Sequence, residues 1–310
     1  MVTPVRFFSH FSMVLLITGI VLCPALAAED HQLNPAKIAA ASGTKVTKAP
    51  GGVVKIAWAR TDVPVTVDGM RLDPFAGLGS WAAFTPTQHG AMVMGDTVVF
   101  QDEVSPAMDA AFAAGLEVSG LHNHFFFDEP KVYFMHIGGH GNPEQLAAAV
   151  KGVWDAIKNV RAKRPKPARS FAGEVPRSGH VSSEPIERIL GHKAETQHGV
   201  VKVTVGRTGT MHRVRVGGPM GLTTWAAFSG SDDSAAVDGD FIMTAQEVQP
   251  VLRALRKSGI HIVALHNHMI GESPAFYFTH FWGKGPAKDL AAGVKLALEA
   301  QKAAQQPAEH

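Results

Sequence analysis

The chain carries the same histidine pattern twice, and this internal repeat limits its possible folds more than any other feature. In each copy a Leu-His-Asn-His motif is followed by a Tyr-Phe-x-His motif. The histidine of the second motif lies twelve residues after the second histidine of the first motif. The first triplet is His122, His124 and His136, and the second triplet is His266, His268 and His280. Every member lies 144 residues from its counterpart. A chance match would not keep one offset over three positions, so the chain contains two copies of one domain.

The repeat extends well beyond the histidines. Trp81–Phe84 matches Trp225–Phe228 at the same offset, and Gly52–Lys55 matches Gly199–Lys202 at an offset of 147. One loop therefore differs by three residues between the copies. At 310 residues the chain is long enough for two domains, each with its own hydrophobic core.

Composition divides the chain into five expected segments. The stretch Lys163–Pro167 is basic and proline-rich without apolar periodicity, which is typical of a semi-extended linker. A contact of this stretch with an acidic polymer or a lipid is the alternative. The expected segments are a signal peptide (1–28), repeat 1 (29–161), a linker (162–183), repeat 2 (184–305) and a tail (306–310).

The N-terminus has the residue order of a secretory signal peptide. Arg6 precedes the apolar run Met13–Leu22, and the small residues Ala25–Ala28 follow. The run is too short for a permanent membrane span, so we expect cleavage near the end of the alanine stretch. This predicts a periplasmic or secreted protein without a stable transmembrane segment. An uncleaved N-terminal anchor is the alternative.

The cysteine count limits the chemistry of any metal site. Cys23 is the only cysteine and would leave with the signal peptide. Its lipidation is an alternative, although Leu22 stands where lipoprotein signals have a small residue. A mature chain without thiols cannot form disulfides, and it can bind a metal only through imidazole, carboxylate or water.

Apolar periodicity predicts the same order of strands and helices in both copies: several strands, a helix, two strands and a long helix. In the first copy we expect strands at 53–58, 63–67, 92–100, 118–124 and 133–136, with helices at 105–115 and from 143 onward. In the second copy we expect strands at 200–205, 212–216, 240–244 and 262–268, with helices from 249 and at 290–298. The predicted fold is α+β, with two tandem homologous repeats, each a largely antiparallel sheet with helices packed on one face.

The histidine spacing indicates a metal site. Alternate residues of a strand share a face, so the two histidines of each HxH motif point the same way, with Cα atoms about 6.5 to 7 Å apart. A hairpin to the next strand would bring His136 directly or diagonally opposite His122. Three imidazoles leave a fourth position open, as in catalytic zinc sites. We therefore expect each triplet to bind a divalent transition metal, with zinc as the first choice.

Acidic residues that recur in both copies are candidates to complete the site. Glu103 and Glu247 are the candidate catalytic residues, and capping of the following helix is the alternative for both. Asp96 and Asp240 form a second pair of candidate carboxylates. For the loop acids Asp128, Glu129 and Glu272, the functional interpretation is a supporting or general-base role. The alternative is that they are solvated surface residues.

The predicted function is binding of a divalent metal, extended in one hypothesis to metal-activated water that hydrolyses a small, unidentified envelope substrate. The alternative is a non-catalytic periplasmic protein that binds a ligand or a metal. A metal-free ligand pocket and a hydrogen-bonded structural network are the other interpretations of the histidines. The net charge of +2 and the dispersed basic residues argue against nucleic acid as a partner.

The phrases Leu-His-Asn-His and Pro-x-x-Tyr-Phe-x-His, with Leu-Ala-Ala in the helix that follows, resemble the LppY/LpqO family. The resemblance covers nearly the whole mature chain. It implies a duplicated domain of unknown function in the bacterial envelope, and it supplies neither a reaction nor catalytic residues.

Overall fold

The structure, a computed structural model, describes residues 32–306. The predicted signal peptide and most of the predicted tail lie outside the described residues. Within the described range, no helix has the length and apolar character needed to cross a membrane.

The first repeat forms an antiparallel sheet with three helices and a small accessory sheet. The main elements are α1 (Pro35–Ser42), β1 (Val46–Lys48), β2 (Val54–Ala59), β5 (Gly79–Thr87), β6 (Gly90–Phe100), α2 (Val104–Ala113), β7 (Glu117–His122), β9 (Val132–Gly141) and α3 (Pro143–Lys163). The accessory sheet contains β3 (Thr66–Val67), β4 (Met70–Arg71) and β8 (Asp128–Glu129).

The second repeat has the same order of elements. The main elements are α4 (Ser183–Leu190), β10 (Ala194–Gln197), β11 (Val200–Gly206), β14 (Thr223–Gly230), β15 (Ala235–Met243), α5 (Ala245–Lys257), β16 (His261–His266), β18 (Tyr277–Gly285) and α6 (Ala287–Ala304). The accessory sheet contains β12 (Thr208–Met211), β13 (Val214–Gly217) and β17 (Glu272–Ser273). The predicted α+β class with two tandem repeats is confirmed.

The main strands of both repeats join in one twelve-stranded sheet, in the order β1-β2-β5-β6-β9-β7-β16-β18-β15-β14-β11-β10. The repeats meet where β7 pairs with β16, with Leu121 opposite Leu265. Because these two strands are antiparallel, the two copies are related across the seam by an approximate twofold rotation. The repeat pattern predicted two sheets, and the edge pairing that unites them was not predicted.

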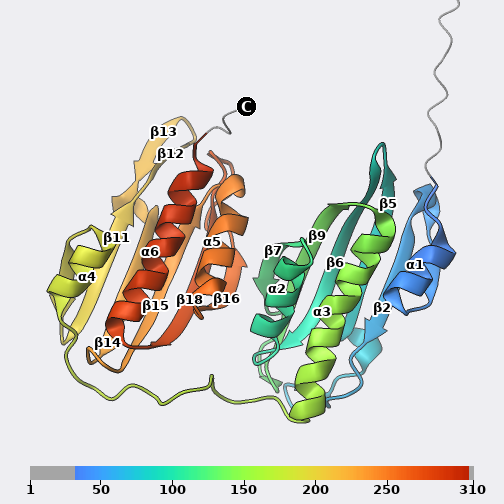
Figure 1. Ribbon diagram of the computed structural model, residues 1–310, viewed down its shortest axis with the longest axis horizontal. Helices are drawn as coiled ribbons and strands as arrows, with labels where there is room; N and C mark the ends of the chain where they lie inside the picture. The colour runs from blue at the N-terminus through green and yellow to red at the C-terminus, as the bar shows by residue number, and fades with distance from the viewer. Residues whose placement is uncertain (1–31, 307–310) are drawn as a thin grey trace, which may run out of the picture. The chain divides into compact units, whose positions relative to one another are not determined.

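Helices cover one face of the sheet. Figure 1 shows α3 over β6 and α2 over β7 in the first repeat, with α6 over β15 and α5 over β16 in the second. In α3 the Asn142 side chain accepts a hydrogen bond from the Gln145 backbone amide at the N-terminus. The apolar stripe of α3, which includes Val150 and Trp154, is buried against the sheet as its periodicity predicted.

The opposite face of the sheet carries no helix, and the accessory sheets cover only part of it. Beneath them lie two separate apolar clusters, one around Phe100 and Phe134 and the other around Phe276 and Phe278. Along β18, Gly283 faces Leu290 of α6, so the alternating residues His280 and Trp282 face the side without helices. The histidines of the repeat therefore lie on the open face.

Several element boundaries differ from the sequence prediction, and two of the differences concern candidate site residues. The HxH strands end at His122 and His266, so His124 and His268 lie in the bends that follow. The helix expected from residue 249 begins at Ala245, because the Glu247 side chain accepts a hydrogen bond from the Thr244 amide at the helix start.

Side chains connect the repeats at the seam. The Gln249 amide donates to the Val118 carbonyl at 2.8 Å and accepts from the Val118 amide at 3.1 Å, as a strand neighbour would. At the position equivalent to Gln249 in the first copy, Ser105 Oγ lies 2.8 Å from His261 Nδ1. Burial, followed by the nearby Arg256, lowers the pKa of His261 from 6.5 to about 4. This histidine is therefore neutral at the seam.

We expect His261 to make the protein less stable in acid. The unfolded chain binds a proton at His261 below about pH 6.5, whereas the folded protein does so only near pH 4. The contribution of His261 to the free energy of unfolding should therefore fall by roughly 1 to 3 kcal/mol as the pH drops from 6.5 to 4, because solvent screens a partly exposed group. Urea unfolding across this range should show a smaller loss for His261→Gln. The exposed His89→Gln control should keep the loss seen in the unmodified chain, and an unchanged loss in His261→Gln would contradict the assignment.

Candidate metal centre

Strand pairing brings His122 and His136 together in the first repeat. Gly120 of β7 pairs with His136 of β9, and His122 pairs with Phe134, so the two histidines are diagonal neighbours. Their Nε2 atoms are 2.9 Å apart. Ligand nitrogens around a tetrahedral zinc are about 3.3 Å apart, given Zn–N bonds of about 2.0 Å. The diagonal arrangement is one of the two that the sequence predicted.

The second triplet has the same strand pairing, and here all three histidines come close together. Ala264 of β16 pairs with His280 of β18, and His266 pairs with Phe278. One nitrogen from each of His266, His268 and His280 lies within 4.8 Å of the other two. Among residues 32–306, only this group of histidine and acidic side chains meets that criterion for three ligands. The second triplet therefore has the geometry to bind a metal ion.

The neighbouring asparagines orient the first histidine of each HxH motif. Nδ1 of His122 lies 3.3 Å from the Asn123 carbonyl oxygen, and Nδ1 of His266 lies 3.3 Å from the Asn267 carbonyl oxygen. The Asn267 side chain donates to the Met269 carbonyl at 2.8 Å and so holds the bend. When a backbone carbonyl takes Nδ1–H, Nε2 is the free ligand atom.

An aromatic ring supports the histidine in each bend. His124 stacks on Phe134 with ring centroids 3.3 Å apart, and His268 stacks on Phe278 at 3.4 Å. Burial, with the nearby His266 and His280, lowers the pKa of His268. Burial and the neighbouring histidines likewise lower the pKa of His124. Both imidazoles are thus held in the neutral form that binds metals.

A buried aspartate lies directly beside each triplet. Asp96 is opposite His136 in the sheet, and Asp240 is opposite His280. Asp240 Oδ2 lies 3.5 Å from His268 Nε2, and Oδ1 lies 3.9 Å from His280 Nδ1. Burial raises the pKa of Asp240, although His280 and His266 oppose the rise.

Each of these aspartates has a buried oxygen without a hydrogen-bond partner. The unpartnered atoms are Oδ1 of Asp96 and Oδ1 of Asp240. An unpaired buried carboxylate oxygen is costly and is usually explained by a function or by a bound ion or water. The aspartates therefore fit the role of fourth ligand, or of hydrogen-bond acceptor for a ligating imidazole.

The candidate catalytic glutamates have other partners. Glu103 is fully buried and bonds both Arg60 and Arg161, with Arg60 Nη1 2.7 Å from Glu103 Oε2. Glu247 pairs with Arg207 and accepts from the Thr244 amide. Neither glutamate has a contact with a triplet histidine in the described structure. These partners fit the alternative of capping and ion pairing, and a catalytic role for either glutamate stays a prediction without a supporting contact.

The loop acids hold the turn between the HxH strand and the next one. Asp128 accepts hydrogen bonds from Lys131 and from the Val132 amide, and Glu272 accepts one from the Phe276 amide. Glu129 is exposed and lies 3.6 Å from Arg169 of the linker. None of the three is brought to a triplet by a hydrogen bond or ion pair found in residues 32–306.

Two features of the site were missed from the sequence. Phe134 and Phe278 precede the third histidine by two residues in both copies, and this repeated position was the available signal. Gly120 was missed as well. A Cβ atom at Gly120 would come to 3.0 Å from the His136 ring, so the ring would have to shift by a few tenths of an ångström; the second copy has Ala264 at the equivalent position, opposite His280.

We expect Asp240→Asn to separate metal binding from folding. The substitution should weaken zinc binding about tenfold to hundredfold, because the carboxylate next to His268 and His280 is lost. The metal-free variant should melt at the same or a higher temperature, because a buried carboxyl is replaced by a neutral amide. Isothermal titration with zinc and a thermal melt would measure the two effects. The matched control is Asp238→Asn, two residues away on the same strand; an equal loss of affinity in both would contradict a special role for Asp240.

Comparisons with known proteins identify a family. No protein with a curated description matches the chain. A crystal structure of the trimeric bacterial microcompartment shell protein PduB is 11% identical, covering 84% of this chain and 94% of that chain, with a TM-score of 0.21. The structure of EtuB from Clostridium kluyveri is 10% identical, covering 83% and 90%, with a TM-score of 0.22. Structural similarity at this level supports no conclusion about function.

The family model described as Domain of Unknown Function (DUF1259) matches the chain twice, over residues 36–156 and 184–300. Each match begins near the first helix of a repeat and ends within its last helix. The two matches together span most of the chain. The protein therefore belongs to this family of unknown function and contains its domain twice in tandem.

Proposed function

We propose that the protein binds a divalent transition metal, with zinc as the first choice, through the second triplet and, at the equivalent position, through the first. The observation that carries this proposal is the convergence of three imidazole nitrogens within 4.8 Å at His266, His268 and His280. The unpartnered Asp240 oxygen beside them supports it.

The ligand chemistry favours zinc over softer and harder ions. Apart from Cys23, the chain has no thiol, so iron–sulfur clusters lack their usual ligands, and the triplets contain no thiolate or thioether sulfur of the kind that cuprous ions prefer. Calcium and magnesium prefer sites made of oxygen ligands, and three imidazoles with one carboxylate do not provide one. Imidazole and carboxylate ligands in a four-coordinate arrangement are typical of zinc.

The site lies at the surface, and this favours exchange with a small molecule. His268 is exposed and His266 and His280 are partly exposed, on the face of the sheet that has no helices. If the three imidazoles alone held the metal and Asp240 stayed outside its coordination sphere, the metal would keep an open position and would supply Lewis-acid activation of water. Asp240, with its raised pKa, is the group placed to hold or transfer a proton there. Hydrolysis of a small envelope substrate is thus the reaction class that we propose to test, with metal or ligand binding without turnover as the second candidate.

Export is part of the proposal. The support is the order of charged, apolar and small residues in segment 1–28 and the resemblance of the duplicated motifs to the LppY/LpqO family of the bacterial envelope. A periplasmic or secreted location would place the histidines where zinc exchanges with the medium.

The decisive experiment is elemental analysis of the mature chain purified without a metal-affinity tag, before and after incubation with zinc. We expect about one metal ion per intact triplet. The His266→Ala variant should lose the ion of the second triplet, and His122→Ala combined with His266→Ala should lose both. Circular dichroism should show that the variants remain folded, because the replaced side chains lie on the open face.

The matched control replaces two exposed histidines outside the triplets, as His89→Ala with His198→Ala. This control should retain the metal content of the unmodified chain. Absence of metal after incubation with zinc, or an equal loss in the control, would contradict the proposal and favour a metal-free ligand pocket.

A further inference from the structure

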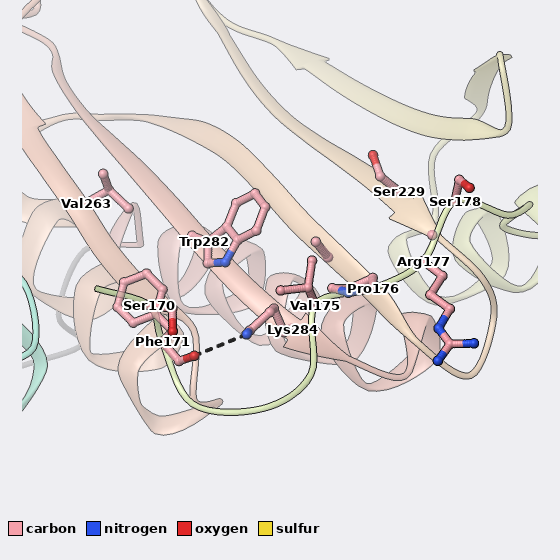
Figure 2. A pocket seen from close by; sticks show the side chains of 12 residues that line it. Ser170, Phe171, Val175, Pro176, Arg177, Ser178, Ser229, Val263, Trp282 and Lys284 are labelled. Carbon is pink, nitrogen blue, oxygen red and sulfur yellow. Dashed lines mark hydrogen bonds between the residues drawn. The ribbon is translucent and has the colours of Figure 1, made fainter. Parts of the chain in front are cut away.

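The chain between the repeats covers a cavity on the open face of the second repeat. The cavity has a volume of about 590 Å³. Its walls include the apolar residues Val175, Pro176, Val263 and Trp282 and the cationic residues Arg177 and Lys284. Figure 2 shows Trp282 between the linker and the sheet, with Lys284 reaching toward the linker backbone. Cavities of about 300 to 1,000 Å³ commonly bind small organic molecules.

Specific contacts hold the linker over the cavity. Lys284 Nζ donates to the Phe171 carbonyl at 3.2 Å and to the Gly173 carbonyl at 2.8 Å. The Phe171 ring stacks on His261 with centroids 3.9 Å apart. At the far end, Ser182 bonds the Asp232 carboxylate through its amide at 2.8 Å and its hydroxyl at 2.7 Å. These contacts fix the linker against the second repeat, so the cavity wall that it forms is part of the folded structure.

The two charged side chains that line the cavity, Arg177 and Lys284, are cationic. Within residues 32–306, neither Arg177 nor Lys284 has a carboxylate within 4 Å, and the partners of Lys284 are neutral carbonyls. No acidic residue lines the cavity. An anionic group at its edge would be attracted by these cationic side chains, while an apolar body would fit against Trp282 and Val263.

The first repeat does not have the side chains that build this cavity. Trp282, Lys284 and Val263 correspond, at the 144-residue offset, to Gly138, His140 and Ser119. The two copies thus share the histidine pattern and differ beside it. Trp282 lies two residues after His280 on the same face of β18, so the cavity adjoins the second triplet, with Cα atoms about 6.5 to 7 Å apart.

We propose that this cavity binds a small organic anion with an apolar body, such as an aromatic or acyl carboxylate, and that the second repeat is therefore the ligand-binding copy. The body packs against Trp282 and Val263, and the two cationic side chains that line the cavity, Arg177 and Lys284, attract the anionic group. The cavity is lined by protein side chains alone and needs no metal to bind the anion, so this inference does not depend on the proposed function.

The test uses two fluorescent probes of nearly the same shape, on protein treated with a chelator. Anilinonaphthalenesulfonate carries an anionic group and phenylnaphthylamine does not. We expect saturable binding of the anionic probe at one site. Arg177→Gln should weaken this binding by about threefold to tenfold and leave binding of the neutral probe unchanged. The matched control is Arg169→Gln, an exposed linker arginine outside the cavity, which should bind both probes as the unmodified chain does.

A second pair of variants tests the location. Val263→Trp places a bulky indole in the cavity and should block binding of both probes, whereas Ser119→Trp places the same side chain at the equivalent exposed position of the first repeat and should not. Circular dichroism checks that both variants fold. Absence of saturable binding, binding that survives Val263→Trp, or equal losses in Arg177→Gln and Arg169→Gln would overturn the proposal. Because no metal is present in these titrations, failure here is distinct from failure of the metal site.

Discussion

Antiparallel pairing between the HxH strand and the strand after it is the constraint on which the rest of the site depends. The pairing of β7 with β9, and of β16 with β18, sets two histidines diagonally opposite each other. The next strand outward then places Asp96 or Asp240 opposite the third histidine. A shift of one residue in this register would move the histidine of the second strand to the apolar face under the helices. The site and the hydrophobic core therefore specify the same register.

The helices on one face leave the other face free for polar chemistry. Apolar burial beneath α2, α3, α5 and α6 stabilises both repeats, and it leaves the exposed histidines outside the core. Each repeat also has an arginine–glutamate pair: Arg60 and Glu103 are both buried, whereas the buried Glu247 pairs with the partly exposed Arg207. Removing the arginine of such a pair would leave a buried glutamate without its charged partner.

Duplication preserved the histidine framework while its surroundings diverged. The two stacked phenylalanines and the two unpartnered aspartates are equivalent in the copies, and the linker wall and Trp282 belong to the second copy alone. The seam between the copies is likewise unequal, because Ser105 bonds His261 whereas its equivalent Gln249 bonds the Val118 backbone. The strand order is therefore symmetric, whereas the side chains at the seam and beside the histidines differ between the copies.

The sequence by itself determined the duplication, the α+β class and the histidine pattern, because a constant 144-residue offset and local periodicity are readable without long-range contacts. It also predicted that His136 would lie near His122, since a short connection leaves antiparallel neighbours as the natural arrangement. Only the tertiary structure decided which acids accompany the histidines. Asp96 and Glu103 are both acidic residues that recur in the second copy, so the sequence does not distinguish them. Strand register places Asp96 opposite His136, whereas Glu103 pairs with the buried Arg60. The joined sheet and the cavity beneath the linker also depend on contacts between residues far apart in the chain, and no local pattern records such contacts.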